Sequence, residues 1–186
     1  AKLTFIQELY SAGLREIEVG AFVRPDRVPQ MKDSDSILSS IQHHKIQIPK
    51  AKPYFLVPNE KGLERAQKAG VKHIAIFTAA TDGFNTRNIN MTVEQSLEQY
   101  KPLVKKALAA KMSVRGYVST AFGCPFDGKV KAAQSLRVIE ALLKMGVFEV
   151  SVGDTIGVGT PLEVKNLFDP AVRNFGPDKL AAHFHD

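Results

Sequence analysis

Residues 68–78, KAGVKHIAIFT, contain the pattern that decides the fold. A segment with helical periodicity ends here, a glycine follows it, and an apolar run comes directly afterwards. Glycine supplies the left-handed backbone conformation with which many helices end. The stretch therefore predicts a helix that ends at Ala69 and a strand that begins near Lys72.

Two other stretches repeat this pattern. Residues 11–14 read SAGL and residues 144–147 read KMGV, and each lies between a helix candidate and a strand candidate. Strand candidates that are apolar without a clear two-face alternation are typical of parallel sheets covered by helices. The repeat favours a barrel over a doubly wound sheet, since neither a GxGxxG motif after the first strand nor a P-loop is present in the sequence.

Strand and helix candidates alternate along the chain. An amphipathic segment comes first, and Gly13 ends it. Thr92 and Gln95 have the spacing of a capping box at a helix start, and Pro161 suits the first turn of another helix. The predicted strands cover residues 15–22, 52–57, 72–78, 112–119, 147–153 and 179–185. The predicted helices after the leading one cover residues 28–43, 59–69, 92–110, 129–145 and 161–175.

The length fits a barrel only in part. The chain has 186 residues, whereas a complete (β/α)8 barrel has eight strands and about 250 residues. We therefore predict an α/β fold, an incomplete TIM barrel with about six of the eight parallel strands. This partial barrel is expected to form a single catalytic domain over residues 1–186, with the first barrel strand preceding Ala1.

The composition is that of an ordinary globular protein, with 44% hydrophobic and 24% charged residues. The single cysteine excludes an internal disulfide, and no apolar run approaches the roughly 20 residues of a membrane span. Lys and Arg number 25 against 19 Asp and Glu, a net charge of +6. These cations are scattered and aromatic residues do not interleave with them, so we predict neither a nucleic-acid nor a membrane partner.

The polar residues at the carboxyl ends of the predicted strands are the candidates for chemistry, because barrels build their sites there. His183 and His185 end the last predicted strand, and residues two apart on a strand point to the same side. Two neighbouring imidazoles are suitable ligands for a divalent metal. Asp154 stands at the tip of the preceding strand, before the glycine-rich residues 155–161, and is a candidate general acid or base.

Glu18 lies inside the apolar run of the first predicted strand. Burial of a carboxylate is costly unless it meets a cation, a hydrogen-bond donor or a substrate. The residue is therefore either part of a structural salt bridge or part of a functional site.

The remaining histidines and the cysteine carry less chemistry. His43 and His44 are expected at the surface, at a helix end beside Lys45. His73 begins a strand, at the end of the barrel away from a site. Cys124 has no neighbouring histidine or helix N-terminus in the sequence to lower its pKa, so we predict a structural role for it.

Six short motifs, in this order, resemble the 3-hydroxy-3-methylglutaryl-CoA lyase family, and they span the whole chain. A set of six motifs is far more specific than any one of them. The motifs are EIEVGAFVRP (16–25), TRNIN (86–90), SVRGYVS (113–119), GCP (123–125), GDTIGVGTP (153–161) and HFHD (183–186).

The resemblance implies a metal-dependent TIM barrel of the lyase and acyl-CoA aldol superfamily. The implied cofactor is Mg²⁺ or Mn²⁺, the implied substrate is an acyl-CoA, and the implied assembly of the full-length protein is a homodimer. The family's site corresponds here to the catalytic residues Glu18, Asp154 and His183, the metal ligands His183 and His185, and the substrate-binding residues Arg87 and Asn88.

The implied reaction is a retro-Claisen cleavage of 3-hydroxy-3-methylglutaryl-CoA to acetyl-CoA and acetoacetate, as in leucine degradation and ketone body metabolism. The implied compartment is the cytoplasm of a bacterium or the mitochondrial matrix of a eukaryote. Two alternatives stay open at this point. One is a synthase of the same superfamily that condenses an acyl-CoA with a 2-oxo acid, and the other is a non-catalytic protein that binds through its basic surface.

The sequence also departs from the family's pattern. The family's Arg-Asp pair would precede Ala1, and its catalytic cysteine and metal-ligating asparagine would follow Asp186. These 186 residues alone are therefore expected to have no activity. Cys124 belongs to a different motif, and Ala21 stands where these lyases often carry serine.

Overall fold

The computed structural model describes residues 1–43 and 45–185, which divide into two compact units. The first unit comprises Ala1–Ala75 and Ala110–Met112, and the second comprises Ile76–Ala109 and Ser113–Asp186. The strand β3 (His73–Ala79) begins in the first unit and ends in the second. The interpretation of residues 1–186 as one domain stays a prediction.

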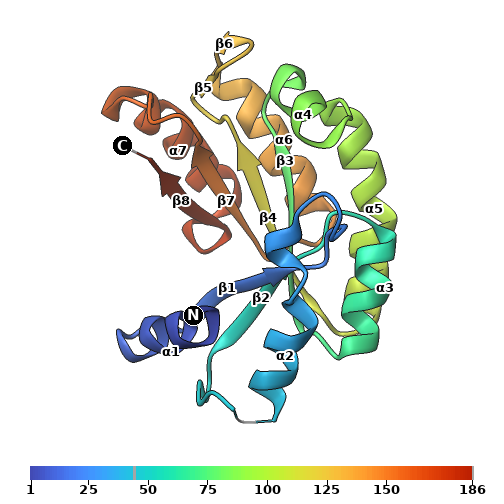
Figure 1. Cartoon of the computed structure of the whole chain (residues 1–186). Coiled ribbons are helices and arrows are strands. Elements are labelled where there is room, and N and C mark those ends of the chain that lie inside the picture. The colour runs from blue at the N-terminus through green and yellow to red at the C-terminus, as the bar shows by residue number, and fades with distance from the viewer. Residues whose placement is uncertain (44, 186) are drawn as a thin grey trace. The chain divides into compact units, whose positions relative to one another are not determined.

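The first unit alternates helices with parallel strands (Figure 1). Its strand β2 pairs in parallel with β1 on one side and with the start of β3 on the other. Between β1 and β2 the chain forms a short 3-10 helix before it enters α2. The elements are α1 (Lys2–Ser11), β1 (Glu16–Ala21), the 3-10 helix Pro29–Met31, α2 (Ser34–Gln42), β2 (Lys52–Leu56) and α3 (Glu60–Ala69).

The second unit continues the same alternation. Its strands lie in the order β3, β4, β7 and β8, with a separate two-stranded hairpin formed by β5 and β6. The helices are α4 (Asp82–Ile89), α5 (Val93–Ala109), α6 (Ala132–Lys144) and α7 (Pro161–Phe175), and Pro177–Lys179 form a 3-10 turn. The strands are β4 (Ser113–Ser119), β5 (Gly123–Cys124), β6 (Gly128–Lys129), β7 (Glu149–Asp154) and β8 (Leu180–Phe184).

The predicted glycine residues at helix ends and the predicted capping box are confirmed. Gly70 follows α3 with a φ of +83°, and Gly13 and Gly146 follow α1 and α6 with φ values of +105° and +98°. The capping box at Thr92 and Gln95 is present, since the backbone N–H of each residue donates to the side chain of the other. The glycine turns and caps therefore place the helix boundaries that the sequence indicates.

The six predicted strands are also confirmed, and together they form one sheet of parallel βα units, as expected for an incomplete barrel. The alternation of burial along β1 and β4 differs from the expectation of continuously apolar strands. In β4 the buried Val114 and Val118 alternate with the part-exposed Arg115 and Tyr117. Helix side chains such as Leu142 of α6 cover positions near one face of β4, whereas the other face carries polar residues.

Two expected helices have different bounds in the structure. The expected helix over residues 28–43 divides into the 3-10 turn and α2, with Pro29 in the first turn of the 3-10 helix. The expected helix over residues 129–145 begins only at Ala132, because Gly128 and Lys129 pair with β5. Helix α4 and the hairpin of β5 and β6 were not predicted from the sequence. Within the described part of the chain, none of the helices has the length and apolar character needed to cross a membrane.

Substitution of Gly62 tests the packing of the first unit. A Cβ at this position in the first turn of α3 would lie 2.6 Å from the backbone oxygen of Phe22, which has little room to move. We expect Gly62→Ala to lower the free energy of unfolding by about 1–3 kcal/mol, as measured by urea denaturation. Lys61→Ala, an exposed change on the same helix, should change it by less than about 0.5 kcal/mol. Equal effects of the two changes would contradict the packing argument.

Candidate active site

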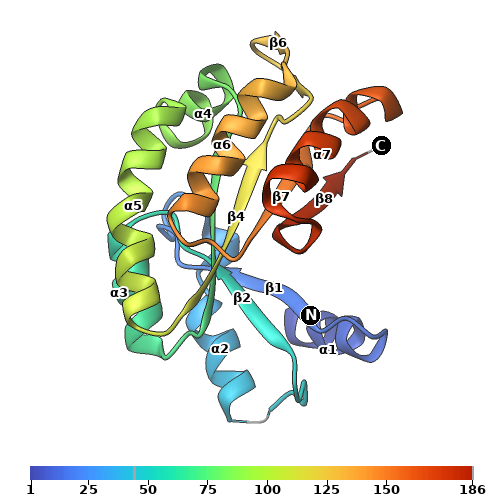
Figure 2. The same cartoon turned by 180° about the vertical axis from the view of Figure 1, so that it is seen from behind.

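The carboxyl ends of β3, β4, β7 and β8 form the edge of the second unit where its candidate residues gather. Helix α4 follows β3, the hairpin follows β4, and the glycine-rich loop follows β7. Figure 2 shows α4 and the hairpin at the end of the sheet toward which β4 points. This placement agrees with the expectation for the carboxyl ends of barrel strands.

The two histidines at the end of β8 lie side by side, as predicted. Their ring centroids are 4.7 Å apart, and both residues are exposed. His183 pairs with Gly153 of β7 in the sheet. The Nδ1 atom of His185 lies 2.9 Å from the backbone oxygen of Asp154. Because a carbonyl oxygen can only accept a hydrogen bond, Nδ1 is the donor, and Nε2 is the ring nitrogen left for a metal.

This arrangement suits a metal ligand. Ligating histidines commonly donate their second ring N–H to a carbonyl or carboxylate, which fixes the tautomer and the ring orientation. The two imidazoles thus fit two positions of a divalent metal site. Within residues 1–43 and 45–185, no set of three His, Cys, Asp or Glu side chains is grouped for metal binding. Asp186, the last residue of the HFHD motif, lies outside the described residues.

Asp154 anchors the glycine-rich loop to the end of β7. Its side chain is buried, and the two carboxylate oxygens accept hydrogen bonds from the backbone N–H groups of Val158 and Gly159 at 3.1 Å and 2.8 Å. The backbone oxygen of the same residue holds His185. One residue therefore fixes the loop with its carboxylate and a metal-ligand candidate with its backbone.

A second carboxylate secures the far end of this loop. Glu163 in the first turn of α7 accepts hydrogen bonds from the backbone N–H and the hydroxyl of Thr160, and it forms an ion pair with Lys129 of β6 at 2.9 Å. The Lys129 ammonium, followed by the two Thr160 donors, lowers the pKa of Glu163 to about 2. The carboxylate is therefore ionised at neutral pH.

Glu18 belongs to the first unit, where it lies in the middle of β1. The structure corrects the expectation that it would be buried in an apolar run, because Ile17 and Val19 point to the buried face and Glu18 lies on the exposed face. It lines a groove between α1 and β1 together with Ile6 and Ile17. The register of β1 against β2 shifts after Glu18, which pairs with Tyr54.

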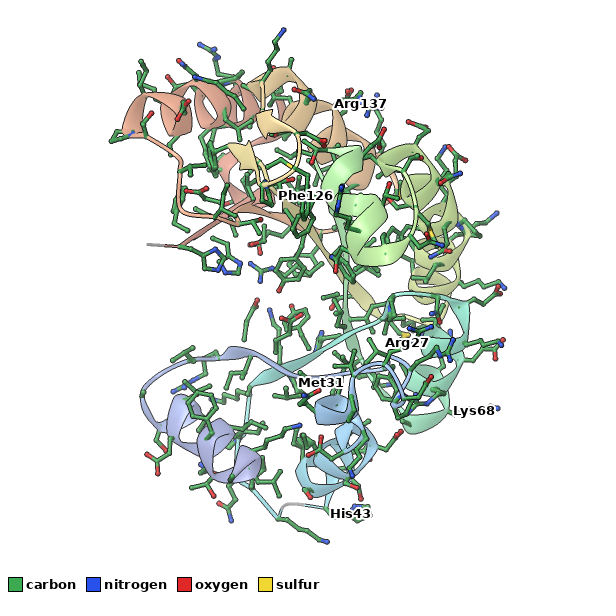
Figure 3. All side chains as sticks on the ribbon, turned by 45° about the horizontal axis from the view of Figure 1, so that its top comes forward. Arg27, Met31, His43, Lys68, Phe126 and Arg137 are labelled. Atoms are coloured by element: carbon green, nitrogen blue, oxygen red, sulfur yellow. The ribbon has the colours of Figure 1, made fainter. Side chains whose placement is uncertain are left out.

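Arg87 and Asn88 lie on α4, which the sequence analysis did not predict. Both residues are exposed on this helix at the carboxyl end of β3. The Arg87 guanidinium lies 4.2 Å from the ring centroid of Phe126, at the tip of the hairpin (Figure 3). Arg87 also donates to the backbone oxygen of Gly83 at 3.1 Å.

The structure places His43, His73 and Cys124 as the sequence predicts, at the surface, at the amino end of a strand or in a buried position. His43 is exposed at the end of α2 (Figure 3), and His73 is the first residue of β3, at its amino end. Burial is the largest cause that lowers the pKa of His73. Cys124 is buried, and its sulfur accepts hydrogen bonds from backbone N–H groups of its own hairpin. His44 lies outside the described residues.

A polar cluster on β4 and β7 was not singled out from the sequence. Arg115 donates to Glu149 at 2.6 Å and to the Tyr117 hydroxyl at 2.9 Å, and all three side chains are part-buried. Burial alone would lower the pKa of Arg115, but Tyr117 and Glu149 outweigh it and raise this pKa above its usual value. In the sequence, only the two-residue spacing of Arg115 and Tyr117 within a predicted strand could have indicated that these two side chains share a face.

Comparison with known proteins places these features in a family. A family model described as HMGL-like matches residues 1–186. The chain belongs to the HMGL-like family. It is 42% identical over 186 residues to a hydroxymethylglutaryl-CoA lyase from Pseudomonas mevalonii, and this match covers 100% of the chain and 60% of the relative. The HMGL-like chain therefore spans about 60% of the length of that relative.

Solved structures agree with this assignment of the HMGL-like chain. A crystal structure of a hydroxymethylglutaryl-CoA lyase from Pseudomonas aeruginosa matches with a TM-score of 0.93 and 42% identity, over 100% of this chain and 60% of that one. An HMG-CoA lyase from Acinetobacter baumannii in complex with coenzyme A and 3-methylmalate matches with a TM-score of 0.89 and 30% identity, over 99% and 59% of the two chains.

The role of Asp154 as a loop anchor can be tested by hydrogen exchange. Asp154→Ala removes both acceptors of the Val158 and Gly159 amides, and hydrogen bonds to a charged group are worth about 1.5–3 kcal/mol. We expect the exchange of these two amides to accelerate roughly ten- to a hundred-fold, measured by NMR. Asp178→Ala, an exposed carboxylate on the same unit, is the control. Unchanged protection of both amides in Asp154→Ala would disprove the anchor.

The low pKa of Glu163 predicts a pH-dependent contribution to stability. Its pKa falls from a usual 4.5 to about 2 in the folded chain. The contribution is therefore present above pH 4.5 and lost as the pH falls toward 2. We expect Glu163→Ala to lower Tm at pH 7, and this difference should shrink between pH 4.5 and 2 in thermal melts. A Tm difference that stays constant between pH 4.5 and 2 would contradict the lowered pKa of Glu163.

Proposed function

We propose that this chain forms part of the catalytic domain of a lyase that cleaves 3-hydroxy-3-methylglutaryl-CoA to acetyl-CoA and acetoacetate. The observation that carries the proposal is the pair of adjacent imidazoles at the end of β8, with the tautomer of His185 set by Asp154. The match of the HMGL-like family to residues 1–186 supports the same reaction. The lyase function of the relatives favours cleavage over the condensation of a synthase.

The reaction needs one base and one acid, and the protons balance. A base takes the proton of the C3 hydroxyl, the bond between C2 and C3 breaks, and the electron pair moves into the acetyl-CoA enolate. An acid then returns a proton to the enolate carbon. His183 is suited to the proton transfer because an imidazole can both accept and donate a proton through its ring nitrogens. Glu18 and Asp154 are proposed as the carboxylates that assist it.

The proposed metal is Mg²⁺ or Mn²⁺, with His183 and His185 as two of its ligands. When bound, the ion would supply Lewis-acid chemistry and orient the substrate oxygens. The role of this chain in the site is to hold the two rings side by side at the end of β8, two residues apart. The hydrogen bond from His185 to the backbone of Asp154 prevents rotation of that ring.

Arg87 and Asn88 are proposed to contact the coenzyme A arm of the substrate. They lie on α4, at the carboxyl end of β3. A guanidinium is suited to phosphate groups, which the coenzyme A arm carries. The net charge of +6 favours the approach of such an anionic substrate. A homodimer, and a location in a bacterial cytoplasm or a mitochondrial matrix, complete the proposal.

Substitution of His183 in the full-length protein tests the function. His183→Ala removes one proposed ligand and proton carrier, so we expect the affinity for Mn²⁺ to fall at least about tenfold and turnover of 3-hydroxy-3-methylglutaryl-CoA to be lost. Electron paramagnetic resonance measures the first, and release of acetoacetate measures the second. His43→Ala is the matched control, since His43 is an exposed histidine of the other unit.

Two results would overturn the proposal. If the full-length protein with Mg²⁺ cleaved no 3-hydroxy-3-methylglutaryl-CoA but bound oligonucleotides at moderate salt, the lyase function would be wrong and the basic binding protein would replace it. If His183→Ala kept both metal affinity and turnover, the ligand assignment would be wrong, although the family would stand.

A further inference from the structure

The hairpin formed by β5 and β6 contacts α4 in the second unit. Gly123 pairs with Lys129 and Cys124 with Gly128, so residues 125–127 form its turn. Both elements lie at the same end of the sheet (Figures 1 and 2). Arg87 of α4, which is proposed above to contact coenzyme A, is one of the residues that the turn contacts.

The hairpin supplies the cap of α4. The backbone N–H of Gly83, in the first turn of the helix, donates to the Asp127 carboxylate at 2.8 Å. Among the described contacts, the residue that precedes the helix, Thr81, gives no side-chain cap. A carboxylate at this position satisfies an orphan N–H and complements the helix dipole. A Cβ at Gly83 would overlap an Asp127 oxygen, so a side chain there would displace the carboxylate from its present position.

The buried cysteine holds the turn that presents this carboxylate. The backbone N–H groups of Phe126 and Asp127 donate to the Cys124 sulfur at 3.4 Å and 3.3 Å. The shape of the turn is thus fixed from within the hairpin. The buried thiol therefore has a structural contact within the hairpin.

The side chain at the tip of the turn orders the guanidinium of Arg87. The Phe126 ring lies below the guanidinium at 4.2 Å and near the Phe84 ring at 6.3 Å. One N–H of Arg87 is used by the backbone oxygen of Gly83. A guanidinium has five N–H donors, so most of them are left for an anion after the ring and this oxygen have fixed its plane. Phe126 itself is 49% exposed, so the tip is accessible to a ligand.

We propose that Asp127 and Phe126 are positioning residues for the coenzyme A arm. Asp127 fixes the start of α4, Phe126 fixes the Arg87 guanidinium, and Arg87 pairs with a phosphate of the arm. The proposal rests on the proposed function, in which Arg87 meets coenzyme A. Ordering a flexible Arg before the ligand arrives reduces the entropy lost on binding, and a cation–π contact supplies that order.

Calorimetric titration of the full-length protein with coenzyme A tests the proposal, and pantetheine, which lacks the nucleotide phosphates, is the reference ligand. We expect Phe126→Leu and Asp127→Ala each to weaken coenzyme A binding roughly three- to tenfold and to leave pantetheine binding unchanged. Asp127→Asn keeps an oxygen acceptor for Gly83 and should restore much of the affinity. With the acyl-CoA substrate, KM should rise in the same proportion while kcat stays constant.

Matched controls separate the positioning role from a structural one. Asp169→Asn removes an exposed carboxylate of α7, which pairs with Lys165, and should change neither affinity. Circular dichroism melts show whether each variant is folded. Phe126→Leu is an exposed apolar replacement that leaves the cap intact, so it remains informative if Asp127→Ala fails to fold.

The outcomes distinguish the two proposals. If Arg87→Ala weakens coenzyme A binding but both hairpin variants bind normally, the positioning role is wrong and the substrate contact stands. If Arg87→Ala itself leaves binding unchanged, the coenzyme A contact of the proposed function is wrong, whether or not the enzyme is a lyase. Equal losses of coenzyme A and pantetheine affinity in the hairpin variants would mean general distortion and would also overturn the positioning role.

Discussion

The hydrogen bonds of Asp154 are the interactions on which the candidate site depends. A buried carboxylate is stable only when its oxygens are satisfied, and here two backbone N–H groups of the glycine-rich loop satisfy them. The loop must therefore fold back over the end of β7. The same residue fixes the ring of His185 through its backbone oxygen. The loop and the metal-ligand candidate are consequently both held by Asp154, the loop by its carboxylate and His185 by its backbone oxygen.

The fold could be predicted from the sequence because its determinants are local. Gly70 ends α3 by its own conformation, and the Thr92 capping box needs only residues three apart. The pairing of His183 with His185 was equally local, since it follows from the two-residue period of a strand. The single-domain interpretation and the catalytic roles of Glu18 and Asp154 stay predictions.

The missed elements depend on contacts between residues far apart in the chain. Helix α4 is capped by Asp127, which accepts a hydrogen bond from the backbone N–H of Gly83 44 residues earlier, so the cap cannot be seen in the local sequence. The hairpin strands are two residues each, too short for any periodicity. The Arg115, Tyr117 and Glu149 cluster joins two strands that a helix separates in sequence. Such features require the fold to be known before they can be inferred.

The close approach of Asp127 to Gly83 also has a consequence for sequence variation. Any side chain at position 83 would occupy the space of the Asp127 carboxylate. A larger residue at 83 would therefore require that the Asp127 side chain rotates away and gives up the cap of α4, that the residue at 127 becomes smaller, or that the hairpin is displaced. We expect the two positions to covary among relatives of this chain, although 44 positions separate them.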